Sequence, residues 1–209
     1  MKKTNTFIFS VGLLALILSI IFYIFFDKSI ALAASRISQG DFIYKASTFI
    51  GVWMGSRQMF FVALLIGIIG IYFLLRKNKK IGYRCLLIFL IYVVSYIITF
   101  AIKCILARYR PDLFLSQSLY GFSWFHTAHD LTSMPSGHAA ANFALGLSAA
   151  TFLYKRYSSL ALLLIIYGFI VAASRVIINM HYVSDVLLSL TVVTWSMLLV
   201  FKFIKFQTA

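Results

Sequence analysis

The sequence predicts an all-α, polytopic membrane protein: one domain over residues 1–209, built as a bundle of six transmembrane helices. Hydrophobic residues make up 62% of its 209 residues and charged residues only 11%, whereas a soluble domain carries about 25% charged residues. The apolar residues also collect in runs close to the about 20 residues that cross a bilayer as a helix. An unusually apolar soluble protein is the alternative that these runs disfavour.

Helices are expected because lipid offers no water to an unpaired backbone group, and the alternation typical of strands is absent. No internal repeat divides the apolar runs, so one domain is expected. In order, the six runs are about Phe7–Phe26, Met59–Leu75, Cys85–Ile102, Ala139–Tyr154, Ser158–Ser174 and Val183–Phe201.

The first run has features of a secretory signal, because Lys2 and Lys3 precede it and Ala31-Leu32-Ala33 follows it. Its about 20 apolar residues exceed the about 7–15 of a signal core, which favours a retained membrane anchor. The mixed segment 27–57 that follows is expected along the outer interface, where Tyr44 and Trp53 suit the head-group layer.

The third and fourth runs carry two further expectations. Cys85 and Cys104 stand near opposite ends of the third run, roughly 28 Å apart at about 1.5 Å per residue, which is beyond disulfide reach. In the fourth run, Ala140, Ala144 and Ser148 recur every four positions. Small residues at this spacing allow close helix contact, so this helix is expected inside the bundle.

The net charge of +14 arises from 19 Lys and Arg against five acidic residues, all Asp. The cations lie between the apolar runs instead of forming a stripe, so no nucleic-acid partner is expected. Loops on the side of the N-terminus are short and dense in Lys and Arg, which predicts that this side is cytoplasmic. Their basic residues are Lys2, Lys3, Arg76, Lys77, Lys79, Lys80, Arg84, Lys155, Arg156, Lys202 and Lys205. The opposite side carries every aspartate and histidine.

Polar and charged residues that are unfavourable inside a lipid bilayer occur in three short segments. The first, 103–111, follows the third run; the second, 135–138, precedes the fourth; the third, 174–185, joins the fifth and sixth. Because successive spanning helices alternate in direction, all three segments are expected at one face, opposite the N-terminus.

Together these segments contain the groups that bind a doubly charged anion. Lys103, Arg110 and Arg175 supply three cations, and the guanidinium groups match the paired oxygens of a phosphate. Ser136 and Gly137 precede a helix, whose first N–H groups and positive end also favour an anion. Phosphate is therefore the candidate ligand.

Two histidines flank this expected phosphate site. His181 and Asp185 are four residues apart, so on a helical turn the carboxylate can accept from one ring nitrogen and leave the other to attack. His138 is placed to protonate a leaving alcohol. A nucleophile, an orienting carboxylate, an acid and three cations are the groups that phosphoryl transfer requires.

The patterns Lys-x6-Arg-Pro, Pro-Ser-Gly-His and Ser-Arg-x5-His-x3-Asp in these segments resemble, without departure, the three signature motifs of the type-2 phosphatidic acid phosphatase superfamily. The resemblance implies a metal-independent membrane phosphatase without a cofactor. It implies His181 as nucleophile, His138 as general acid and Asp185 as orienting carboxylate. The implied phosphate ligands are Lys103, Arg110, Ser136, Gly137, His138 and Arg175.

Two neighbouring features are interpreted as having no chemical role. Arg108 lies outside the motif pattern and is interpreted as extending to the membrane interface. His126, His129 and Asp130 could bind a metal but are interpreted as ordinary surface residues. Their loop, 112–134, is expected to cap the site and to touch lipid through its aromatic side chains.

The sequence and its resemblance therefore predict hydrolysis of a lipid phosphate monoester or pyrophosphate in a bacterial inner membrane, at a site facing the periplasm or exterior. Phosphatidic acid, phosphatidylglycerol phosphate, undecaprenyl diphosphate and lipid A are candidate substrates. Transfer of the phosphate to a second lipid is an alternative that uses the same residues. Haloperoxidase relatives are soluble, and a transporter would carry charges along a path through the bilayer, so both are disfavoured.

Overall fold

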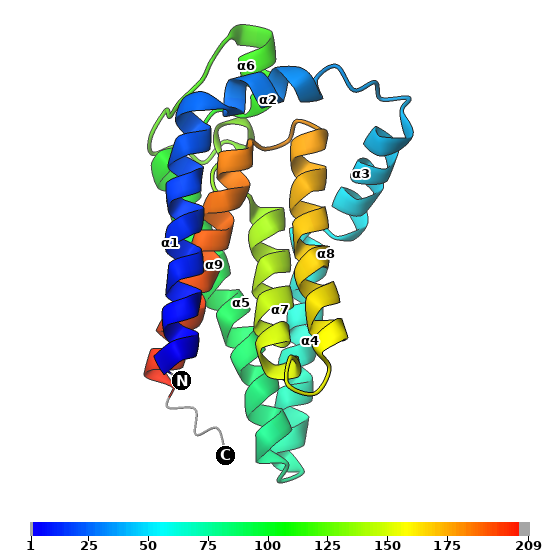
Figure 1. Ribbon diagram of the computed structural model, residues 1–209, viewed down its shortest axis with the longest axis vertical. Coiled ribbons are helices and arrows are strands. Elements are labelled where there is room, and N and C mark those ends of the chain that lie inside the picture. Colours follow the sequence, from blue (N-terminus) through cyan, green and yellow to red (C-terminus); the bar gives the residue numbers. More distant parts are fainter. Residues whose placement is uncertain (1, 205–209) are drawn as a thin grey trace.

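The computed structural model describes residues 2–204, and helices are the regular secondary structure in that range (Figure 1). The long helices are α1 (Lys2–Phe25), α4 (Ser56–Leu75), α5 (Lys79–Leu106), α7 (Gly137–Leu153), α8 (Ser158–Ile177) and α9 (Val183–Phe203). The short ones are α2 (Asp27–Ala34), α3 (Phe42–Trp53), α6 (Pro111–Gln117) and the 3-10 helix η1 (His129–Leu131). In the bundle, α1 packs on α9, α4 on α5, and α7 on α8.

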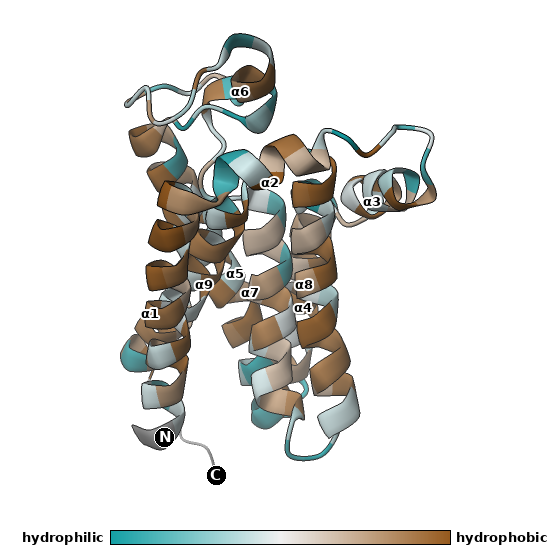
Figure 2. Ribbon diagram, turned by 45° about the horizontal axis from the view of Figure 1, so that its top comes forward, coloured by the Kyte–Doolittle hydropathy of each residue, from teal (hydrophilic) through white to brown (hydrophobic). Residues whose placement is uncertain are grey.

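Within residues 2–204, five helices are long and apolar enough to cross a membrane, namely α1, α4, α5, α8 and α9. Their residues are largely hydrophobic (Figure 2). The expected fourth span is shorter: α7 has 17 residues, about 25 Å at about 1.5 Å per residue, against a hydrocarbon core of about 30 Å. The all-α membrane bundle is confirmed, while a count of six spans stays a prediction.

Helix α7 fills the interior of the bundle. Ala140, Ala144 and Ser148 are 3%, 0% and 0% exposed. A Cβ at Gly146 would lie 2.7 Å from the carbonyl oxygen of Leu164, so glycine is what allows α8 to approach this closely. The expectation of a small-residue helix inside the bundle is confirmed. Figure 1 also shows α7 beginning below the upper ends of α8 and α9, which recesses its first residues.

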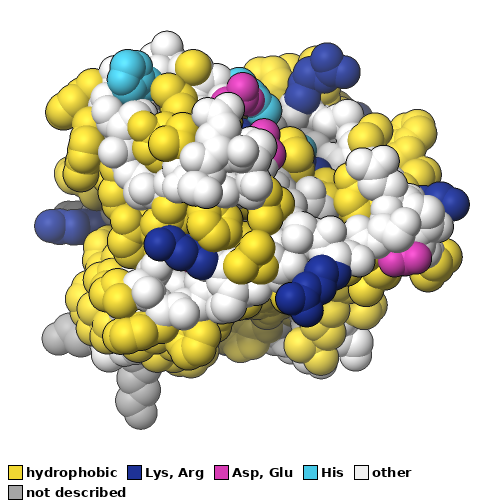
Figure 3. Space-filling view, turned by 90° about the horizontal axis from the view of Figure 1, so that it is seen from above, with side chains coloured by type: hydrophobic (Ala, Val, Ile, Leu, Met, Phe, Trp, Pro, Cys, Tyr) yellow, Lys and Arg dark blue, Asp and Glu magenta, His cyan; other side chains and the backbone are white. Residues whose placement is uncertain are grey.

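The segment after α1 forms two short helices near the end of the bundle opposite the start of α1 and the end of α9. Helix α2 lies across the upper end of the bundle, and α3 packs against α8 (Figure 1). Phe42, Phe49 and Trp53 of α3 are 87%, 63% and 61% exposed. Seen from above, hydrophobic side chains cover much of this end, with scattered Lys and Arg (Figure 3). These exposed aromatic groups support the predicted interfacial position.

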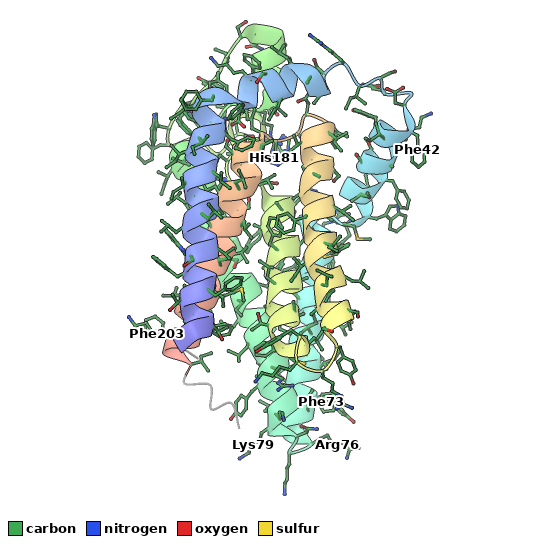
Figure 4. The ribbon with its side chains drawn as sticks, in the orientation of Figure 1. Phe42, Phe73, Arg76, Lys79, His181 and Phe203 are labelled. Atoms are coloured by element: carbon green, nitrogen blue, oxygen red, sulfur yellow. The ribbon has the colours of Figure 1, made fainter. Side chains whose placement is uncertain are left out.

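The opposite end carries the basic loops. The start of α1 and the end of α9 lie there together (Figure 1). Figure 4 places Arg76 and Lys79 at this lower end and His181 in the upper part of the bundle. Among the basic residues assigned to this side, Lys205 lies outside the described residues.

Candidate active site

Four helix ends bring the three polar segments together. Helix α5 ends just after Lys103, α7 begins at Gly137, and the short connection between α8 and α9 contains His181. The segments are thus neighbours although they are far apart in the sequence. The expected site residues that are less than a tenth exposed are Arg110, Ser136, Arg175, His181 and Asp185.

His181 and Asp185 face each other at the start of α9. Asp185 is the third residue of the helix, and its carboxylate accepts from the backbone N–H of Tyr182 at 2.9 Å in a capping box. His181 Nδ1 lies 3.5 Å from Asp185 Oδ2, which is longer than a good hydrogen bond; catalytic contacts of this kind often tighten when substrate binds. With Nδ1 engaged, Nε2 is the ring atom left to meet a substrate.

Ser133 lies between these two side chains, although it is outside the three polar segments of the sequence. Its Oγ donates to Asp185 Oδ2 at 2.5 Å and lies 3.4 Å from His181 Nδ1. The residue is fully buried. Ser133 therefore shares the carboxylate with the histidine. Its closeness to the Pro-Ser-Gly-His segment was the only sequence signal.

Lys103 lies beside the start of α7. Its Nζ donates to the carbonyl of Thr132 at 2.6 Å, and its Cε would be 3.7 Å from a Cβ at Gly137. Ser136 is the N-cap of α7, with its Oγ accepting from a backbone N–H of the first turn at 3.4 Å. The N–H of Ser136 donates to the carbonyl of Asp185 at 3.2 Å. An ammonium beside a helix N-terminus favours an anion.

Two buried guanidinium groups complete the set of cations. Arg110 donates from Nε to the carbonyl of His129 at 2.8 Å and from Nη1 to that of Met180 at 2.9 Å. Arg175, in the last turn of α8, touches Gly51 of α3, where a Cβ would lie 2.0 Å from Nη1. Its Nε is buried and has no hydrogen-bond partner among the described residues. This unpaired N–H group is available to donate a hydrogen bond to a bound anion.

His138 meets the junction of α3 and α4. The backbone of Gly51 lies close to its ring, and a Cβ at Gly55 would lie 3.4 Å from its Nε2. Asn142, one turn further along α7, donates to the carbonyl of His138 at 2.9 Å. Because Arg175 touches the same Gly51, the histidine and this arginine share one patch of backbone supplied by α3.

His129 and Asp130 do not join these residues. His129 Nδ1 lies 3.0 Å from Asp130 Oδ1, and the two side chains are 70% and 65% exposed. Within residues 2–204, no three His, Cys, Asp or Glu side chains gather as a metal site would require. His126 is exposed as well. Their interpretation as surface residues fits this geometry.

The loop 112–134 packs on α1 through aromatic rings. Tyr120 and Phe122 stack on Tyr23 with ring centroids 5.3 and 5.2 Å apart. Trp124 and Phe125 are 50% and 78% exposed. Part of the loop is thus anchored above the bundle, and part presents aromatic groups outward, as a lipid-touching cap would.

Comparison with known proteins places the chain in a family. A sequence model of the PAP2 superfamily matches residues 84–209. The chain belongs to the PAP2 superfamily. Its fold is similar to the crystal structure of the first transmembrane PAP2-type phosphatidylglycerolphosphate phosphatase from Bacillus subtilis, with a TM-score of 0.68 and 24% identity over 93% of this chain and 94% of that one. A search of curated proteins finds no match.

In this PAP2 protein, residues outside the family match also reach the site. The match begins in α5, yet α3 contributes Gly51 to the surroundings of His138 and Arg175. Asp27, the first residue of α2, is 1% exposed. Helices α2 and α3 thus help to build the site that the family motifs occupy.

The interpretation of Arg108 as an interfacial residue is wrong. Its side chain is fully buried, with Nη1 2.5 Å from Asp185 Oδ1 and Nη2 2.8 Å from Asp27 Oδ2. Burial disfavours the charged guanidinium, but the two carboxylates raise the pKa of Arg108 above its ordinary value. The surrounding rings are those of Tyr23, Tyr120 and Tyr182, with centroids 4.9, 5.3 and 4.2 Å away. A buried ion pair, not snorkelling, decides its position.

One sequence signal pointed toward this pairing. Asp27 directly follows the first apolar run, where a carboxylate at membrane depth needs a partner. Ser184 also holds Asp27, through its backbone N–H at 3.2 Å and through its hydroxyl. Nothing in the sequence named Arg108 as the partner.

The electrostatics of the site favour a neutral His181. Burial lowers the pKa of His181 well below its ordinary 6.5; contact with Asp185 raises it, and the charges of Arg110 and Lys103 lower it. The net direction is downward. A neutral imidazole keeps the lone pair that a nucleophile needs.

Proposed function

We propose that this PAP2 protein hydrolyses a phosphate group of a membrane lipid through a phosphohistidine on His181. The observation that carries the proposal is the buried pair of His181 and Asp185 beside three cationic side chains. The site then contains a nitrogen lone pair on His181, an orienting carboxylate on Asp185 and groups that bind an anion. Phosphoryl transfer requires these three together.

In the first step, Nε2 of His181 attacks phosphorus. The P–N bond forms, the P–O bond to the lipid breaks, and His138 donates a proton to the departing oxygen. Asp185 stabilises the charge that develops on the imidazole ring. In the second step, water attacks the phosphohistidine while His138 accepts its proton, and inorganic phosphate leaves as the P–N bond breaks.

The cations have two tasks in this mechanism. Lys103, Arg110 and Arg175, with the N–H groups at the start of α7, bind the non-bridging oxygens and stabilise their charge. In the free protein, His138 lies beside the positive charge of Arg175. A bound phosphate brings negative charge to this position and so stabilises the protonated form of His138. Arg108 and Ser133 act through Asp185 and are positioning residues.

The substrate class is a lipid phosphate monoester or pyrophosphate. Phosphatidylglycerol phosphate is the first lipid to test, because the B. subtilis protein of similar fold is described as acting on it. Phosphatidic acid, undecaprenyl diphosphate and lipid A phosphates are the other candidates. The dense basic loops at the opposite end support a site facing the periplasm or exterior of a bacterial inner membrane.

Phosphate release from each lipid by the purified protein tests this proposal. We expect release without any acceptor lipid, inhibition by vanadate, and full activity with a strong chelator. Phosphate that appears only on a second lipid would indicate a phosphotransferase. Loss of activity with EDTA, restored by a divalent ion, would contradict the mechanism and favour a metal at His126, His129 and Asp130.

A further inference from the structure

A second cationic cavity lies at the opposite end of the bundle. It has a volume of about 800 Å³ and opens between the start of α1, the α4–α5 turn, the α7–α8 turn and the end of α9. Its basic lining residues are Lys80, Arg84, Lys155 and Arg156. Apolar and aromatic groups, among them Phe152 and Phe201, form other parts of its wall.

No acidic side chain offsets this charge. The five acidic residues of the chain are Asp27, Asp41, Asp112, Asp130 and Asp185. They belong to α2, the turn before α3, α6, η1 and the start of α9, toward the other end of the bundle. Like charges gathered without a counter-charge raise the local potential and attract an anion.

Arg84 shows that the cavity is more than a basic surface. It is half-buried, and its guanidinium carbon lies 5.9 Å from the ring centroid of Phe152. Its Nε is buried and has no hydrogen-bond partner among the described residues. A half-buried guanidinium with an unpaired N–H group has lost a hydrogen bond to water. A bound anion would accept a hydrogen bond from that group and so replace the one that was lost.

The neighbouring lysines provide a contrast. Lys77 lies in the turn between α4 and α5, and Lys79 is the first residue of α5. Both are exposed, and neither lines the cavity. The preference for positive residues on one membrane side accounts for those two. It does not by itself account for Arg84, whose half-buried side chain lines the cavity beside Phe152.

We propose that this cavity is a second anion site, distinct from the catalytic one, that binds the phosphate group of an anionic phospholipid. Basic pockets between transmembrane helices bind such head groups. The guanidinium of Arg84 and the ammonium of Lys155 would contact the phosphate oxygens, and Phe152 and Phe201 would contact the acyl chains. The proposal is independent of the catalytic mechanism.

Native mass spectrometry of the full chain, released from nanodiscs of phosphatidylglycerol and phosphatidylcholine, tests the site. Phosphatidylglycerol is a phosphodiester and so lacks the terminal phosphate that the catalytic site is proposed to take. We expect wild-type protein to retain it in preference to phosphatidylcholine, and Arg84→Gln/Lys155→Gln to bind it about tenfold more weakly or worse. The charge-matched control, Lys77→Gln/Lys79→Gln, should retain it within about twofold. Unchanged turnover of a soluble aryl phosphate shows that each variant is folded.

The outcomes separate the sources of the phosphate. Displacement of the lipid by millimolar inorganic phosphate would show that the phosphate group alone is recognised, whereas retention would show that the acyl chains contribute. Equal weakening in the cavity variant and the control, or equal retention of both lipids by the wild type, would overturn the proposal.

Discussion

Arg108 Nη1 lies 2.5 Å from Asp185 Oδ1, and both side chains are fully buried. The other terminal nitrogen of the same guanidinium reaches Asp27 Oδ2 at 2.8 Å. Arg108 therefore connects the carboxylate behind the proposed nucleophile to α2 at the upper end of the bundle. Removing the arginine would leave two buried carboxylates without their cation.

Replacing Arg108 tests whether this connection positions the catalytic carboxylate. We expect Arg108→Gln to lower kcat by about 10–100-fold, the range seen when groups that orient ligands are removed, with KM little changed. Stability should fall by about 3–5 kcal/mol because a buried ion pair is broken. Arg108→Lys should recover part of kcat, since lysine can pair with one carboxylate but lacks the planar fork.

Arg36→Gln is the matched control, because Arg36 is exposed near the end of α2. It should leave both kinetic constants and the melting temperature unchanged. A folded Arg108→Gln protein with wild-type kcat would show that the ion pair is structural only.

The two histidines are predicted to differ in their response to the leaving group. His181→Ala should abolish turnover of lipid and aryl phosphates alike, because the attacking nitrogen is gone. His138→Ala should slow lipid hydrolysis by about 10²–10⁴-fold, as general acids contribute that much. It should regain much of this loss with an aryl phosphate, whose leaving group needs no proton.

Rapid quench into base, which preserves phosphohistidine, gives the decisive measurement. His138→Ala should form labelled protein from the aryl ester. Label on His181→Ala but not on His138→Ala would mean that the two roles are reversed.

Gly51 is predicted to control the position of Arg175. A Cβ at this position would lie 2.0 Å from Arg175 Nη1, so Gly51→Ala must displace the guanidinium. We expect KM to rise about tenfold, equivalent to about 1.4 kcal/mol of binding. Gly40→Ala is the control, because its Cβ would meet only Ser38 Oγ, at 3.5 Å. Equal KM values for the two variants would show that Arg175 does not contribute to phosphate binding.

Sidedness can be measured with an impermeant thiol reagent on intact cells. In a background without Cys85 and Cys104, a cysteine at exposed Ser118 should react, while one at exposed Asn78 should react only after permeabilisation. The basic loops near Asn78 predict this result. The reverse labelling pattern would place the catalytic site in the cytoplasm.

The lowered pKa of His181 predicts a neutral ring under mildly acidic conditions. The folded protein then binds fewer protons than the unfolded chain below pH about 6.5, so this group contributes stability that is lost as pH falls. Histidine-labelled protein should show a neutral His181 ring by NMR at pH about 6.5, with His181→Ala used for assignment. A fully protonated ring at that pH would contradict the proposed nucleophile.

Much of this protein could be predicted from local sequence. The length of each apolar run determines which segments become membrane helices, and alternation of their direction predicts that the motif segments share a face. The pairing of His181 with Asp185 is likewise local, because the two residues are four positions apart, although His181 precedes α9 and does not form a helical turn with Asp185. Those predictions needed no knowledge of which distant segments meet.

The tertiary structure decided the partners of buried charges. Arg108 and Asp27 are 81 residues apart, and Ser133 and Asp185 are 52 apart, so no periodicity or spacing relates them. A charged side chain at a helix end can extend to water or turn into the protein. Which of the two occurs depends on whether the protein interior contains an opposite charge to pair with it. For Arg108, two carboxylates from helices at opposite ends of the sequence meet at one point, and their combined attraction offsets the desolvation of the guanidinium.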